Sequence, residues 1–190
     1  MTSLKFRAAG RDDAEGIARL HADSWRRHYR GAYSDEFLDG DVVSNRLTVW
    51  ASRLATPSAS ATIVAEDDAG LLLGFVHVVF DEDPQWGSLV DNLHVINARR
   101  RTGLGSELLT RAAEAVVGGA TGKALYLWVL EQNTSAQGFY QAFGGTCAEE
   151  PTTVGAPGGV AARLNGTPKK LRMTWADAAT VGRLRPAADR

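Results

Sequence analysis

Hydrophobic and polar positions follow two different periods along this chain, and together they predict a mixture of strands and helices. Alternating or continuous apolar runs predict strands at residues 4–8, 61–66, 71–80, 89–95, 123–130 and 169–175, with a short one at 146–149. Apolar positions three and four apart predict helices at residues 12–28, 35–54, 106–117 and 133–143. The glycine- and proline-rich segment 151–168 is expected to be a loop, and residues 176–190 a frayed tail.

The order of these elements restricts how the sheet is connected. Segments 61–66 and 71–80 flank an Asp-Asp-Ala-Gly turn, so they are expected to pair as an antiparallel hairpin. Segments 89–95, 106–117 and 123–130 form a strand–helix–strand unit, which implies a right-handed parallel crossover. The chain is therefore expected to fold as an α/β domain with a mixed sheet.

Candidate chemistry lies in the run SLVDNLHVINARRRTGLGSELLTRAAEAVV at residues 88–117. A strand is followed by a loop with three arginines, at 99–101, and this loop opens directly into a helix. The first turn of a helix offers unpaired backbone N–H groups and the positive end of the helix dipole. Gly103 and Gly105 allow a ligand oxygen to approach the backbone closely. The segment therefore predicts a site for a phosphate or pyrophosphate group.

Two common phosphate-binding motifs do not fit this loop. A dinucleotide fingerprint needs a third glycine where the chain has Leu108. A nucleotide P-loop needs Gly-Lys-Ser/Thr, whereas Gly105 is followed by Ser106 and Glu107. The ligand is therefore expected to belong to another phosphate class.

Length and composition exclude further classes. With 190 residues, the chain favours one domain, expected at 1–175, that needs neither disulfides nor metals. The net charge of −1 provides no broad positive field, so no nucleic-acid partner is expected. Cys147 has no second cysteine to pair with, so it is expected to be a buried small hydrophobe, and no metal site is expected. No run approaches the ~20 apolar residues of a membrane span and no signal core is visible, so no membrane partner and a cytoplasmic location are expected.

Two motifs in this chain resemble those of a known family. Arg100-x-x-Gly103-x-Gly105, after a strand that ends Leu-x-Val, resembles the acetyl-CoA-binding signature of the GNAT acetyltransferases. Leu127-Trp-Val129-x-x-x-Asn133-x-x-Ala136-x-x-x-Tyr140-x-x-x-Gly144 is similar to the GNAT segment in which a strand ends and a short helix carries Ala and Tyr. The stretch from Ser24-Trp25-Arg26 to Tyr29-Arg30-Gly31 resembles a bacterial branch of the family. The resemblance covers roughly residues 4–175.

This resemblance implies a fold, a reaction and a co-substrate. The implied fold is a single α/β (α+β) domain whose mixed, mostly antiparallel sheet of six to seven strands splays between two central parallel strands, with about four helices. The implied reaction moves an acetyl group from acetyl-CoA to a primary amine of a small molecule by direct attack. The residues implied to bind the cofactor are Leu93, His94, Val95, Arg100, Arg101, Thr102, Gly103, Leu104, Gly105, Ser106, Asn133, Ala136 and Tyr140.

The resemblance also implies catalytic roles. The backbone N–H of Val95 is the candidate donor to the tetrahedral oxyanion. Tyr140 is the candidate general acid, because a phenol of pKa about 10 can protonate a thiolate whose acid has a pKa of about 8.5 at a small energetic cost. The alternative for Tyr140 is packing on the sheet. Asn133 is expected to bond the pantetheine arm, to cap its helix, or both.

The general base is less defined by the sequence. Asp91 is the first candidate, because strand alternation predicts that it shares a face with Leu93 and Val95. Its ordinary pKa of about 3.9 requires a water relay. His94 and His77 are alternatives, each with a packing role as the simpler interpretation.

Trp25, Tyr29 and Tyr33 are the candidate residues of the acceptor pocket, although aromatic residues there are equally consistent with core. Other readings are a protein or peptide N-acetyltransferase and a non-catalytic acyl-CoA-binding sensor. A homodimer is possible on family grounds. The sequence does not identify the acceptor.

Overall fold

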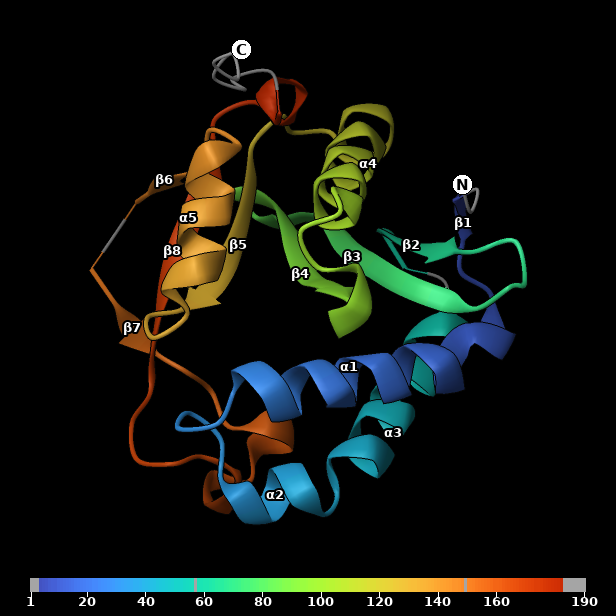
Figure 1. Cartoon of the computed structure of the whole chain (residues 1–190). Coiled ribbons are helices and arrows are strands. Elements are labelled where there is room, and N and C mark those ends of the chain that lie inside the picture. The colour runs from blue at the N-terminus through green and yellow to red at the C-terminus, as the bar shows by residue number, and fades with distance from the viewer. Residues whose placement is uncertain (1–3, 57, 149, 183–190) are drawn as a thin grey trace.

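The protein is an eight-stranded mixed sheet with helices on both faces (Figure 1), and its computed structural model describes residues 4–56, 58–148 and 150–182. The sheet order is β1-β2-β3-β4-β5-β8-β6, with β7 also paired to β8. The strands are β1 (Lys5–Ala8), β2 (Ser60–Glu66), β3 (Leu72–Asp83), β4 (Gly87–Val95), β5 (Leu125–Leu130), β6 (Thr146–Cys147), β7 (Thr152–Thr153) and β8 (Lys169–Trp175). Strands β4 and β5 are parallel and the other pairs are antiparallel, as the hairpin and crossover patterns predict.

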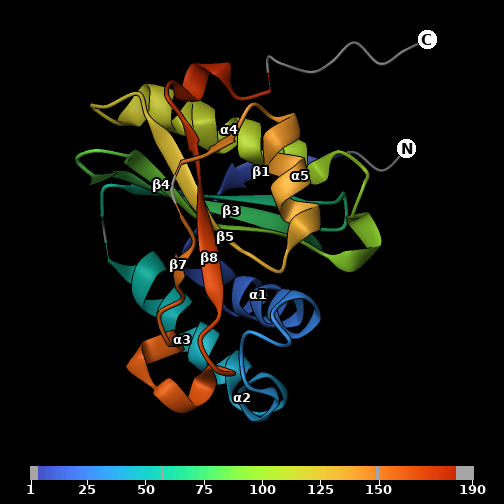
Figure 2. The same ribbon diagram turned by 90° about the vertical axis from the view of Figure 1, so that its left-hand side faces the viewer.

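The helices lie in two layers (Figure 2). They are α1 (Ala14–His28), α2 (Asp35–Asp39), α3 (Val42–Ala55), α4 (Leu104–Gly119) and α5 (Thr134–Ala142). Helix α4 buries its apolar stripe against one face of the sheet, where Leu108 and Leu109 join Val76, Leu127 and Met173 in the largest core cluster. Helices α1 and α3 cover the opposite face through a second cluster around Ile17, Trp50 and Phe75. The layers therefore confirm the expected class and its mixed, mostly antiparallel sheet.

The helix predicted at 35–54 is divided into α2 and α3, so the described part of the chain has five α-helices instead of about four. The hydroxyl of Ser34 caps α2 by accepting from the Phe37 N–H across 3.4 Å. The chain then turns at Gly40, where a Cβ would lie 2.9 Å from the Glu36 carbonyl oxygen. Apolar residues keep their helical spacing across this turn. The prediction from periodicity therefore gave one helix where the backbone forms two. The strand count exceeds six to seven because β6 and β7 have only two residues each.

Two expectations near the C-terminus are wrong. Residues 176–182 do not form a frayed tail, because Ala178 and Val181 are buried in the core beside α4 and the Ala178 N–H donates to Lys123 across 2.8 Å. Residues 183–190 lie outside the described residues. Cys147 is exposed instead of buried, because it lies on the short edge strand β6.

Candidate active site

The site is a gap in the sheet between β4 and β5. These two strands pair at three positions only, Ser88 with Leu125, Leu89 with Tyr126 and Val90 with Leu127. Beyond them β4 continues beside β3, and a cavity of about 430 Å³ opens between the strands. It is lined by Ser24, His28, Tyr29, Leu93, His94, Val95, Arg99, Arg100, Arg101, Gly103, Gly105, Ser106, Trp128, Val129, Leu130, Asn133, Ser135, Ala136, Phe139 and Tyr140.

Most of the residues that the motifs single out therefore meet in one place. Of the thirteen residues expected to bind a cofactor, Thr102 and Leu104 are absent from the lining, and Leu104 is buried in the core instead. The lining also contains Trp128, Phe139 and His28, which sequence reasoning did not assign to the site. Phe139 and Trp128 each lie within the second motif, so the motif could have indicated that they line the cavity.

A β-bulge at Asp91 changes the pattern of faces along β4. His77 pairs with Asn92 while Val78 pairs with Val90, so Asp91 is an extra residue without a partner on β3. Leu93 and Val95 pack toward the α4 side, whereas the Asp91 carboxylate bonds Arg53 of α3 across 2.6 Å. The expectation that Asp91 shares a face with Leu93 and Val95 is therefore wrong, because the bulge shifts the alternation by one residue. Asp91 is also absent from the cavity lining.

The backbone of β4 presents polar groups to the gap. The Ile96 N–H donates to the Leu73 carbonyl of β3 across 2.9 Å. Alternate residues of a strand direct their backbone groups to opposite edges, so the N–H groups of Leu93 and Val95 face away from β3 and toward β5. The His94 carbonyl lies against Gly74 of β3, so His94 contributes its side chain to the cavity.

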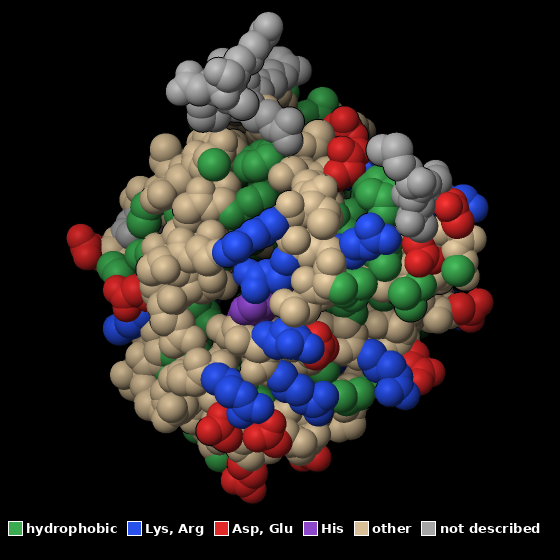
Figure 3. Space-filling view, viewed as in Figure 1, with side chains coloured by type: hydrophobic (Ala, Val, Ile, Leu, Met, Phe, Trp, Pro, Cys, Tyr) green, Lys and Arg blue, Asp and Glu red, His purple; other side chains and the backbone are tan. Residues whose placement is uncertain are grey.

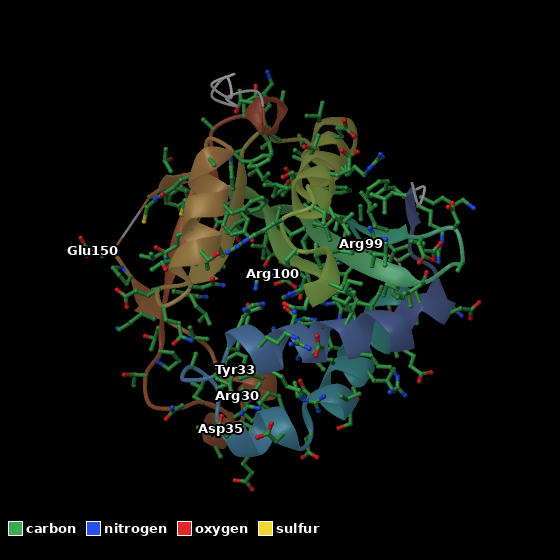
Figure 4. All side chains as sticks on the ribbon, in the orientation of Figure 1. Arg30, Tyr33, Asp35, Arg99, Arg100 and Glu150 are labelled. Atoms are coloured by element: carbon green, nitrogen blue, oxygen red, sulfur yellow. The ribbon has the colours of Figure 1, made fainter. Side chains whose placement is uncertain are left out.

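The loop between β4 and α4 forms the cationic end of the cavity. Gly103 is the N-cap of α4 with a left-handed φ of 89°, and no side chain caps the helix there. The first intrahelical bond runs from Glu107 to Gly103 across 3.0 Å, which leaves the preceding amides without helical acceptors. The space-filling view shows Lys and Arg side chains, with a histidine, gathered around a hollow in the middle of this face (Figure 3). Arg100 lies between the α5 side and the α4 side of that hollow (Figure 4).

Helix α5 supplies the opposite wall. The Asn133 carboxamide oxygen accepts from the Ala136 N–H across 3.2 Å, so Asn133 caps the helix while also lining the cavity. The Tyr140 ring packs edge-on against Phe139 at 5.1 Å and Trp175 at 6.3 Å between centroids. Burial raises the pKa of the Tyr140 phenol, with Tyr29 adding to the effect. Tyr140 is therefore a protonated hydroxyl at the cavity wall across the physiological pH range.

Histidines occupy the α1 side of the cavity. His94 Nδ1 lies 2.8 Å from the Ser24 hydroxyl, and burial with the charges of His28 and Arg46 lowers the His94 pKa to about 3. Its ring lies 4.4 Å from that of His21, whose Nδ1 accepts from the Trp50 indole across 3.0 Å. Because an indole only donates, the proton of neutral His21 is on Nε2. Both rings are neutral at physiological pH.

His77 lies outside this cavity. Its Nδ1 is 2.8 Å from the Thr62 hydroxyl, and its ring packs edge-on against Trp50 at 5.5 Å. Burial, followed by the charge of Arg53, lowers the pKa of His77 to about 4. These contacts give His77 a packing role.

The three aromatic residues expected at an acceptor pocket pack against one another in one cluster. Tyr29 lines the cavity, with its ring stacked on Trp25 at 5.3 Å between centroids. Trp25 and Tyr33 are each 7% exposed and belong to the core between α1 and α2, so they support Tyr29 from behind. Burial raises the pKa of Tyr29 to about 12.

Comparisons with known proteins agree with this geometry. The model of the acetyltransferase (GNAT) family matches residues 17–144. An uncharacterized N-acetyltransferase of Bacillus subtilis, YuaI, is 30% identical over 142 residues, which are 74% of this chain and 79% of that protein.

Two solved structures share the fold. The PaiA N-acetyltransferase of Thermoplasma acidophilum, in complex with coenzyme A, aligns with a TM-score of 0.65 at 16% identity over 91% of this chain and 99% of its own. The spermidine N-acetyltransferase SpeG of Vibrio cholerae aligns with a TM-score of 0.63 at 18% identity over 95% of this chain and 97% of its own.

Among the described residues, no helix is long and apolar enough to cross a membrane.

Proposed function

The chain belongs to the GNAT acetyltransferase family, and on that basis we propose that it transfers an acetyl group from acetyl-CoA to a primary amine of a small molecule. One observation carries the proposal. The gap between β4 and β5 continues into the uncapped N-terminus of α4 beside the arginines at 99–101, so one cavity joins a strand edge to an anion site. An acyl-pantetheine arm attached to a pyrophosphate has that combination of amide groups and charge.

Binding of the co-substrate is assigned to two parts of the cavity. The first-turn amides of α4, with Arg100 and Arg101, hold the pyrophosphate. The Leu93 and Val95 backbone groups that face the gap hold the pantetheine amides as a neighbouring strand would, with Asn133 and Ala136 on the opposite wall. The Val95 N–H then points at the thioester carbonyl and stabilises the oxyanion that forms during attack.

The reaction requires two proton transfers, one to the departing thiolate and one from the attacking amine. The acceptor amine attacks the thioester carbon as the neutral base, the C–S bond breaks, and Tyr140 donates its proton to the departing thiolate. The proton that the amine loses goes to a water relay. Asp91 remains a candidate to end that relay, although its carboxylate is engaged by Arg53 and it does not line the cavity. His94, with a pKa lowered to about 3, is a weak base.

The finer features stay predictions from the sequence. A small-molecule acceptor is proposed here before a protein or peptide acceptor, and Tyr29 is the one residue of the expected acceptor pocket that lines the cavity. Membership of the bacterial branch, a cytoplasmic location and a homodimer belong to the same set of predictions.

The proposal is tested by titrating the full chain with CoA in a calorimeter and by following free thiol released from acetyl-CoA with a panel of amines. Saturable CoA binding and amine-dependent thiol release support it. If the protein binds CoA but no amine in the panel causes thiol release from acetyl-CoA, the acyl-CoA sensor is favoured. Absence of CoA binding contradicts the proposed site.

A further inference from the structure

His28 lines the cavity between β4 and β5 but takes no part in the steps proposed above. It is the last residue of α1, a helix that contacts β4 and crosses below the open end of the gap (Figure 1). The residue is partly exposed, and its imidazole forms no hydrogen bond or ion pair with another described residue. Each ring nitrogen of a histidine can donate or accept a hydrogen bond, so this imidazole is available to a ligand in the cavity.

The cavity lining around His28 is cationic. Three arginines, at 99–101, line the same cavity, and among the described residues no aspartate or glutamate lines it. Figure 3 shows the same arrangement, with a histidine in the hollow and Lys or Arg side chains around it. Asp23 is the carboxylate that acts on His28, and it already bonds Arg27 across 2.9 Å. The side chains that face the cavity therefore suit an anion.

His28 is close enough to Arg100 for the two charges to interact. Burial lowers the pKa of His28, followed by the charges of Arg100 and Arg27, while Asp23 acts in the opposite direction. His94 of β4 also interacts with His28, but burial brings the pKa of His94 to about 3, so that ring stays neutral. The negative end of the α1 dipole favours a protonated His28. Protonated His28 and Arg100 therefore repel each other unless an anion lies between them.

We propose that protonated His28 binds the pyrophosphate of the co-substrate from the α1 side of the cavity, so that binding takes up a proton. The first turn of α4 and Arg100 hold the same anion from the other side. An imidazolium donates a charge-assisted hydrogen bond to a phosphate oxygen, whereas a neutral imidazole donates only the weaker, uncharged kind. The inference rests on the proposed function, because it adds a third element, α1, to the site proposed for that co-substrate.

The direction of the pH dependence follows from two pKa values of His28. In the protein without ligand this pKa lies below the ordinary value of 6.5. A bound pyrophosphate stabilises the charged imidazole and raises the pKa. Between the two values the complex holds more protons than its separate components, so affinity increases as the pH falls through this window. Below the window His28 is charged in both forms, and above it His28 is neutral in both, so affinity is level on either side.

Dephospho-CoA is the probe, because it keeps the pyrophosphate but lacks the 3′-phosphate, whose own pKa of about 6 falls in the same range. The full chain is titrated with it calorimetrically at several values between pH ~5.5 and pH ~8, which bracket the ordinary pKa of histidine. Buffers of different ionisation enthalpy are compared at each pH, and the change in heat gives the number of protons taken up. We expect a dissociation constant about fivefold lower at pH ~6 than at pH ~8, with net proton uptake between them.

Variants then connect the proton uptake to His28. His28→Gln can still form hydrogen bonds but cannot be protonated, so it should abolish the uptake and keep the weaker affinity at every pH. His28→Lys carries a fixed charge, so it should also abolish the uptake but keep the tighter affinity at every pH. His77→Asn is the control, because His77 lies outside the cavity lining, and it should leave the uptake unchanged. The binding stoichiometry reports how much of each variant is folded.

The outcomes separate this inference from the proposed function. Absence of binding by both dephospho-CoA and CoA at every pH would contradict the proposed function. Binding without proton uptake, or uptake that persists in His28→Gln, would overturn the role of His28 alone. An equal loss of affinity at all pH values in His28→Gln would indicate a packing role and would also overturn it. If CoA binds but dephospho-CoA does not, the difference in uptake between wild type and His28→Gln is measured with CoA, because the 3′-phosphate contributes equally to both.

Discussion

A Cβ atom on Gly87 would lie 2.2 Å from the carbonyl oxygen of Ala124, at the point where β4 first meets β5. Gly87 also has a φ of 81°, so both its conformation and its contact with the neighbouring strand require glycine. Gly87→Ala should lower the free energy of unfolding by about 3–5 kcal/mol, because left-handed strain and an overlap with backbone act together. Denaturant unfolding measures the change.

Gly70→Ala is the control for Gly87→Ala. Gly70 has nearly the same φ, 79°, but a Cβ there would have no atom within 4 Å. It should lose only about 1–2 kcal/mol. Equal losses in the two variants would show that the approach of Gly87 to Ala124 does not matter.

Tyr140→Phe tests the general acid. Removing the hydroxyl should lower kcat by roughly 100-fold, the lower range for acid–base catalysis, while the CoA dissociation constant changes little. Steady-state kinetics and calorimetry measure the two quantities. Tyr126→Phe is the control, because Tyr126 is also a buried tyrosine but is absent from the cavity lining. If Tyr140→Phe turns over like the wild type, the hydroxyl only packs.

Gly103→Glu tests the anion site at α4. It places a negative charge beside the open amides of the first turn, so CoA binding should weaken by about 100-fold or more through repulsion. Gly103→Asn is the matched variant, because asparagine tolerates the left-handed φ of 89° and is neutral. A Cβ at this position meets no atom within 4 Å, so both variants should fold. Tight CoA binding by Gly103→Glu would show that the pyrophosphate does not bind at this position.

Stability should fall in acid through the buried histidines. The pKa of His77 is about 4 in the folded protein and about 6.5 in the unfolded chain, so below pH ~6.5 the unfolded state binds more protons. The contribution of His77 is complete above pH ~6.5 and is lost toward pH 4, at up to about 1.4 kcal/mol per pH unit. Denaturant unfolding at several pH values measures the slope. His77→Asn removes the titrating group and should flatten the slope; an unchanged slope would mean that His77 titrates normally.

Periodicity predicted the longer strands of the sheet, and two local motifs predicted residues on both walls of the cavity. The strand–loop–helix run around Gly103 and Gly105 predicted the parallel crossover, which the structure confirms, and it predicts the anion site that is proposed at the start of α4. The motif around Asn133 and Tyr140 likewise fell on the opposite wall. Such features are encoded by neighbours in sequence, so a sequence pattern can predict them.

Other features depend on contacts between distant segments. The bulge at Asp91 arises from its register against β3 and its ion pair with Arg53, and an unbroken alternation of apolar residues gives no sign of either. Arg46 looks like an ordinary polar residue of a surface helix until the packing of α3 on α1 places it over Trp25. Ala178 and Val181 look like a tail until α4 provides the surface that buries them.

Because β4 and β5 pair over three positions only, the sheet consists of two halves that are joined at one end and separate at the other. Past Val90, the described residues of β4 and β5 form no further ladder pairs with each other across the gap. A guest molecule with peptide-like groups would complete the sheet there, acting as the missing strand. Binding of such a molecule would then make the sheet more rigid, and the protein without it would be the more flexible form.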